Sequence, residues 1–140
     1  MPAELPERCD TIEECYEFML AYAAQGLPVE VASASGSQIR EFLNRAVDAI
    51  SGLAECCTAA VKQQGLEPAE RYAAYIAVVD RDARDSLAAI ELVLAQPSIN
   101  SQLIDNLNAS IHLRALLTDL FLLSDIFRSR VRASSPSVRT

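Results

Sequence analysis

The stretch that decides the fold runs from Ile99 to Val131 and reads INSQLIDNLNASIHLRALLTDLFLLSDIFRSRV. Its apolar residues recur every three or four positions, which is the spacing of one face of an α-helix. We therefore predict a single long helix over this stretch. Between Leu113 and Phe127 the apolar positions widen beyond one face, so neighbouring helices have to cover this part on several sides.

Three more helices are predicted before this stretch. The first begins at the capping pair of Thr11 and Glu14 and ends at Gly26. The second runs from Ser35 to Gly65, and the third follows Pro68 and continues to Pro97. The first predicted helix is about half as long as the others, so it should cover only part of the groove between them.

The order and spacing of these helices predict the fold class. The connections near Gly65 and at Gln96–Ser98 are short, which makes sequence neighbours antiparallel. We expect an all-α protein, an antiparallel four-helix bundle with a short first helix and three long helices. One helical domain should span residues 10–132, after a flexible lead over 1–9 and before a disordered polar tail over 133–140. Residues 27–36 are predicted to form the one long loop.

Composition and charge exclude several classes of function. The chain has 140 residues and a formal net charge of −7, and Lys62 is its only lysine, so nucleic acid is not an expected partner. The start holds Glu4 and Glu7 and no apolar run, unlike a signal peptide. No apolar segment reaches the roughly 20 residues needed to span a bilayer. We expect a cytoplasmic protein without a membrane partner.

The sequence lacks the residue patterns of enzymes and metal sites. Its one histidine, His112, has no acidic residue at the spacing of a di-iron bundle. Its four cysteines do not follow zinc or thioredoxin spacing. Asp80, Asp82 and Asp85 look like a carboxylate cluster, but Asp80 pairs with Arg84 and Asp85 with Arg81 at helical spacing, which favours a solvated face. We expect no catalytic residue, no metal and no cofactor.

Two sets of residues remain as candidate sites. The wide apolar face of the last helix favours contact with a protein partner or a second copy of the chain. The residues of this predicted contact surface are Leu116, Leu120, Phe121, Leu123 and Phe127, with Arg128 and Arg130 at the rim. The alternative is a bundle that senses a small molecule or the redox state. Its candidate ligand or redox residues are Tyr72, Tyr75, Cys56 and Cys57.

Two segments resemble a known group of proteins. They are ECYEFMLAYAAQGLP over Glu14–Pro28 and QLIDNLNASIHLR over Gln102–Arg114. Both are similar to segments of small helical accessory proteins of nitrogen-fixing bacteria. The two segments together span 28 of the 140 residues and carry no catalytic motif. The resemblance implies a non-catalytic accessory protein that associates with a larger partner, nitrogenase or its assembly machinery.

Overall fold

The chain is helical throughout the part that the structure describes. A computed structural model describes residues 4–25 and 33–133. The all-α class is confirmed there, but these residues form six helices instead of the four predicted, and no strand. The helices are α1 (Glu4–Gln25), α2 (Ser33–Ile50), α3 (Leu53–Gln64), α4 (Ala69–Leu94), α5 (Ser101–Ala109) and α6 (His112–Ala133).

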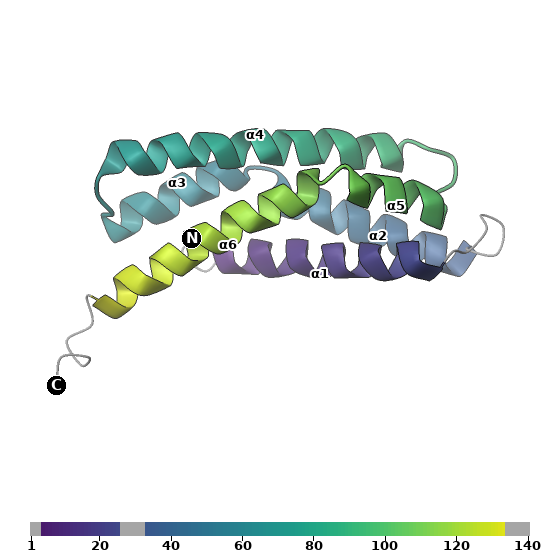
Figure 1. Cartoon of the computed structure of the whole chain (residues 1–140), viewed down its shortest axis with the longest axis horizontal. Coiled ribbons are helices and arrows are strands. Elements are labelled where there is room, and N and C mark those ends of the chain that lie inside the picture. Colours follow the sequence, from purple (N-terminus) through teal and green to yellow (C-terminus); the bar gives the residue numbers. More distant parts are fainter. Residues whose placement is uncertain (1–3, 26–32, 134–140) are drawn as a thin grey trace.

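The six helices form an elongated, layered arrangement (Figure 1). Helix α4 runs along one long side, and α2 and α3 follow one another beside it. Helix α1 lies along the opposite side and packs on α2, α3, α5 and α6. Helices α5 and α6 cross the face between α1 and α4, so α6 contacts both of them.

Helix α1 starts earlier and is longer than the sequence predicts. It begins at Glu4 instead of Thr11 and has 22 residues, as many as α6. Glu4 and Glu7 lie in its first turn, where the positive end of the helix dipole stabilises them, and Pro6 is tolerated in a first turn. Leu5 is buried in the core, so the predicted flexible lead is wrong from Glu4 onward. The short first helix is therefore a wrong prediction as well.

The second predicted helix is two helices that meet at Ser51 and Gly52. Gly52 adopts a φ of 73°, a left-handed conformation that an α-helix does not contain and that glycine adopts at little cost. The arginine of another helix stabilises this break, since Arg8 in α1 donates from Nη1 to the carbonyl oxygens of Ala49 and Ser51. Gly65 ends α3 as predicted, with a φ of 61°.

The long helix predicted over Ile99–Val131 is also two helices. Helix α5 ends at Ala109, and Ile111 has a φ of 62°, which turns the chain before α6 starts at His112. At the other end, the Asn100 side chain caps α5 by accepting a hydrogen bond from the Leu103 amide at 2.8 Å. The predicted helix is correct in its apolar spacing and wrong in its continuity.

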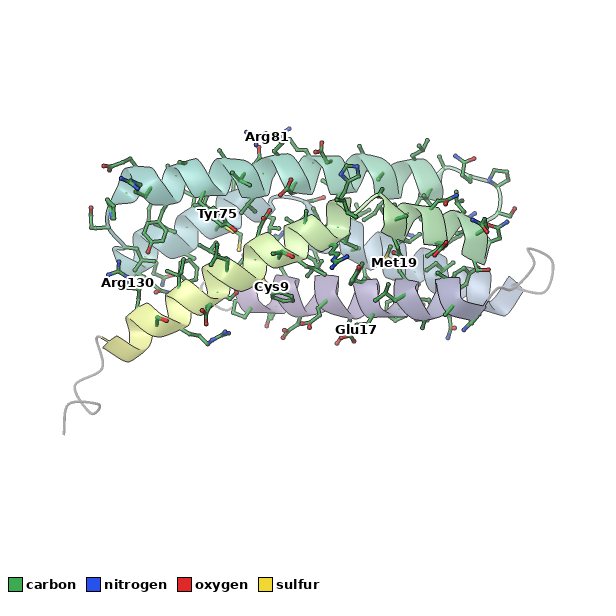
Figure 2. The ribbon with its side chains drawn as sticks, viewed as in Figure 1. Cys9, Glu17, Met19, Tyr75, Arg81 and Arg130 are labelled. Carbon is green, nitrogen blue, oxygen red and sulfur yellow. The ribbon has the colours of Figure 1, made fainter. Side chains whose placement is uncertain are left out.

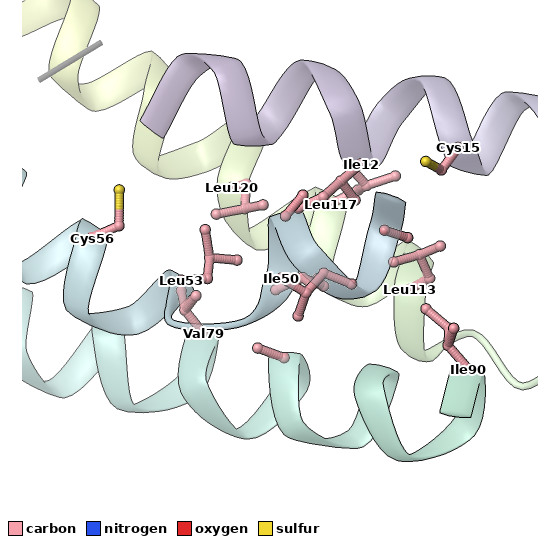
Figure 3. Close-up of a cluster of buried hydrophobic side chains, with 14 of the residues drawn as sticks. Ile12, Cys15, Ile50, Leu53, Cys56, Val79, Ile90, Leu113, Leu117 and Leu120 are labelled. Atoms are coloured by element: carbon pink, nitrogen blue, oxygen red, sulfur yellow. The ribbon is translucent and has the colours of Figure 1, made fainter. Parts of the chain in front are cut away.

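Buried side chains from α1, α2, α3, α4 and α6 meet in one core (Figure 3). Ile12, Ile50, Leu53, Val79 and Leu120 are each at most 1% exposed. Burying a side chain of this size contributes about 1.5–3 kcal/mol. The core therefore holds both helix breaks in place, because residues on either side of Gly52 and of Ile111 contribute to it.

Two predicted irregular segments fall largely outside the described residues. The predicted loop over residues 27–36 lies outside them as far as residue 32, and Ser33 already belongs to α2. The predicted tail over 133–140 lies outside them from residue 134 on.

Candidate functional site

Most of the predicted contact surface is inside the chain's own core. Leu116, Leu120 and Leu123 are at most 1% exposed, and Phe127 is buried. The physical reason is the length of α1, which covers the part of α6 that a short first helix would leave bare. Phe121 is 49% exposed, and Arg128 and Arg130 are exposed too. Of the seven predicted contact residues, these three therefore lie on the surface.

The structure adds a hollow beside these residues, formed where the start of α1, the end of α3 and the second half of α6 meet. We call it the α1–α3–α6 hollow. Its volume is about 550 Å³, which is in the range of small-ligand and side-chain pockets. Its lining is Leu5, Pro6, Ala60, Gln63, Gln64, Ser124, Phe127 and Arg128.

The α6 side of this hollow continues into an exposed stripe. Phe121, Ser124 and Arg128 lie three and four positions apart, so they share one face of α6. Leu122 is 51% exposed next to Phe121. The stripe therefore joins exposed apolar surface to the rim of the hollow.

Each of the two arginines at this end of α6 makes a long polar contact. Arg128 Nη2 is 3.4 Å from Asp125 Oδ1, and both side chains are more than half exposed. Arg130 Nη2 donates to the Glu67 carbonyl oxygen at 3.4 Å. An exposed ion pair of this kind contributes little to stability. Arg128 can therefore leave Asp125 and bind the carboxylate of a partner at little cost in free energy.

A second hollow, of about 570 Å³, lies between α3 and α4. It is lined by small residues such as Ala73 and Ala77 and by the ion pair of Asp80 and Arg84, whose Nε to Oδ2 distance is 2.9 Å. This ion pair confirms the sequence prediction. The α3–α4 hollow contains none of the predicted contact residues, so we place the candidate site in the α1–α3–α6 hollow.

The structure buries most of the predicted ligand or redox residues. Tyr72 is buried and Tyr75 is half-buried, and neither lines the α1–α3–α6 hollow. Cys56 and Cys57 are buried too. Burial raises the pKa of Cys57 to about 12 and of Cys9 to about 11, and it raises the pKa of Cys56 as well. These thiols stay protonated at neutral pH and are weak nucleophiles.

The sequence reading missed one polar group, at the contact of α4 and α6. Asp82, predicted to be on a solvated face, is half-buried, and its carboxyl group lies close enough to that of Asp119 on α6 to perturb its protonation. Burial and the nearby Asp82 raise the pKa of Asp119 to about 7. The sequence offered one signal for it, because Asp119 lies within the most apolar part of α6, where a carboxyl group needs a polar neighbour.

Tyr75 also belongs to this polar group. Its hydroxyl donates to the backbone oxygen of Asp119 at 3.0 Å. Burial and the carboxyl groups of Asp119 and Asp82 raise the pKa of Tyr75 to about 12, so the hydroxyl keeps its proton at neutral pH.

Neither metal binding nor membrane insertion has support in the residues that the structure covers. Within them, no three histidine, cysteine or carboxylate side chains are arranged to hold a metal ion. None of these helices combines the length and the apolar character needed to cross a bilayer. Comparison with protein-family models, curated proteins and solved structures finds no match to this chain.

Proposed function

We propose that this protein is a non-catalytic helical interaction protein that binds a larger protein partner at the α1–α3–α6 hollow. The observation that supports this proposal most directly is the joining of an apolar hollow to an exposed aromatic and an exposed arginine on one face of α6. Aromatic residues and arginine are enriched where proteins bind each other, and a pocket that accepts an apolar anchor residue is typical of the strongest contacts.

The chemistry of the hollow suggests what the partner presents. Leu5, Ala60 and Phe127 line it with apolar surface, which suits a leucine or phenylalanine side chain. Arg128 at the rim suits a carboxylate next to that apolar residue, because an arginine and a carboxylate form paired, charge-assisted hydrogen bonds. The partner segment in this proposal is therefore an apolar residue flanked by an acidic one.

The resemblance to accessory proteins of nitrogen-fixing bacteria selects the first partner to test. Nitrogenase and its assembly proteins are large relative to this chain, as the proposal requires. This choice depends on the two resembling segments alone, and the hollow argues only for a protein partner of the stated chemistry.

The proposal is tested by filling the hollow from an exposed position. Gln64→Trp places a large ring at its edge, while Gln102→Trp on α5 adds the same ring at an exposed position outside the hollow's lining. We expect Gln64→Trp to weaken binding of a purified nitrogenase component by about tenfold or more, and Gln102→Trp to leave it unchanged. Surface-immobilised protein and a concentration series of the component give both dissociation constants.

A charge reversal and the oligomeric state complete the test. Arg128→Glu should weaken the same binding, since it repels the acidic residue of the partner. Sedimentation of the free chain then distinguishes a second copy from a different partner as the occupant. If both Gln64→Trp and Arg128→Glu are folded by circular dichroism and bind like the wild type, the hollow is not the site.

A further inference from the structure

The contact between α4 and α6 contains a carboxyl oxygen without a donor. Although part of Asp119 reaches the surface, its Oδ2 atom is fully enclosed, and no side-chain or backbone donor of the described residues bonds to it. A buried carboxylate oxygen in this state is costly, because it has lost water without gaining a hydrogen bond.

The groups around Asp119 explain why the donor is missing. Tyr75 of α4 has one hydroxyl proton and already donates it to the Asp119 backbone oxygen. Asp82 of α4 is a second carboxyl group, which accepts hydrogen bonds when ionised. Arg81, which precedes Asp82 on α4, points away from α6 on the outer side of α4 (Figure 2).

The groups that shift the pKa of Asp119 include no positive charge. On α6 itself, the residues one turn from Asp119 are Ala115, Leu116, Leu122 and Leu123. Helix α1 brings the Cys9 thiol beside Ser124 of α6. Helix α3 contributes Cys57 near Tyr75, and the one titratable residue of α5, Asp105, is exposed.

We propose that Asp82 and Asp119 share one proton and form a pH-sensitive latch between α4 and α6. The bound proton converts one carboxylate into a donor, which satisfies the enclosed oxygen and leaves one negative charge instead of two. When the pH rises, this proton passes to water, and two negative charges face each other across the helix contact. The closed contact is then destabilised by repulsion and by the buried charge.

The pH range of the latch follows from linkage. In the closed contact the pKa of Asp119 is raised from 3.8 to about 7, and in an opened contact, exposed to water, it returns toward 3.8. Between these values the closed form holds a proton that the open form lacks. Opening therefore becomes about tenfold more favourable for each pH unit between roughly 4 and 7, and levels off above that.

Hydrogen exchange of the α6 amides over residues 116–123 measures this opening directly. After correction for the intrinsic exchange rate, we expect their opening constants to rise about tenfold per pH unit from pH 5 to 7 and then to level off. In Asp119→Asn the amide side chain donates to Asp82 without titrating, so the opening constants should be independent of pH. Asp85→Asn, at an exposed position of α4, is the matched control and should keep the wild-type slope.

A second variant and a second measurement keep the test decisive if Asp119→Asn fails to fold. Asp82→Asn should also remove the pH dependence, because it replaces the other partner of the shared proton. Carbon-13 chemical shifts of the Asp119 carboxyl group should titrate near pH 7 in the wild type. A titration of that group near pH 4, or an unchanged slope in folded Asp119→Asn, would overturn the latch.

Discussion

Ile111 has a strained backbone conformation in this fold. Its φ of 62° lies in the left-handed region, which a β-branched side chain disfavours by about 1–2 kcal/mol. The side chain is 58% exposed, so little burial offsets this cost. Ile111 directly follows Ser110, the C-cap residue of α5, and glycine is the preferred residue at that position.

Ile111→Gly should therefore raise the free energy of unfolding by about 1 kcal/mol, because the strain relieved exceeds the added freedom of the unfolded chain. Urea denaturation at constant pH measures the change. Leu122→Gly is the matched control, since Leu122 is similarly exposed but lies inside α6, and there glycine should lower stability by about 1 kcal/mol. A loss of stability in Ile111→Gly would mean that the side chain contributes more than its exposure indicates.

At the scale of the helices, arginines from one helix cap the end of another. Arg40 of α2 donates from Nη1 to Leu94 O at 3.0 Å and from Nη2 to Gln96 O at 2.7 Å, at the end of α4. Arg8 of α1 does the same at the end of α2. Carbonyl groups at a helix end lack partners within the helix and carry partial negative charge, so a cation there is favourable.

We expect Arg40→Ala to lower the free energy of unfolding by about 2 kcal/mol, because it removes two charge-assisted hydrogen bonds that are half-buried. Arg81→Ala, at an exposed position of α4, should change stability by less than about 0.5 kcal/mol. Thermal unfolding followed by circular dichroism compares the two variants. Equal effects would show that the caps at Leu94 and Gln96 are replaced by water without loss.

The helices themselves were predictable where their apolar spacing is regular. The buried residues Ile12, Cys15 and Met19 of α1 and Tyr72, Ile76 and Val79 of α4 recur every three or four positions, the spacing of one helix face. The break at Gly52 had a local signal in the Ser-Gly pair, whereas the break at Ile111 did not, because isoleucine is among the residues least expected at a positive φ.

The candidate site was less predictable, because it depends on contacts between distant parts of the chain. Phe127 and Arg128 were predicted as contact residues, but Gln63 and Gln64 reach the hollow only through the packing of α3 beside α6. The proximity of Asp82 to Asp119 depends on the register of α4 against α6, which no pattern within either helix specifies. Periodicity shows which face of a helix is buried and does not show which helix lies on it.

The reactivity of the four cysteine thiols is a probe of whether the whole protein unfolds cooperatively. Cys15, Cys56 and Cys57 are buried and Cys9 is half-buried, and burial raises the pKa of all four thiols. At pH 8 the Cys9, Cys15 and Cys57 thiols of the native protein should react with an aromatic disulfide reagent at least about 100-fold more slowly than free cysteine does, since the thiolate is the reactive form.

The same reaction in rising urea gives the control. All four thiols should become reactive together with the loss of helical signal, as expected for one cooperative unit. One thiol that reacts quickly in the native protein would instead support the redox sensor that the sequence left as the alternative.

The contact of α1 with α5 has a consequence for synthesis of the chain. The Tyr22 hydroxyl donates to the Ile99 carbonyl oxygen at 2.6 Å, and Asn108 reaches the Met19 carbonyl oxygen from α5. Ribosomes add about 5–20 residues per second, so these partners emerge several seconds after α1 does. During that interval one apolar side of α1 is uncovered in the nascent chain. Chaperones that hold exposed apolar helices are therefore expected to meet this protein first at its N-terminal helix.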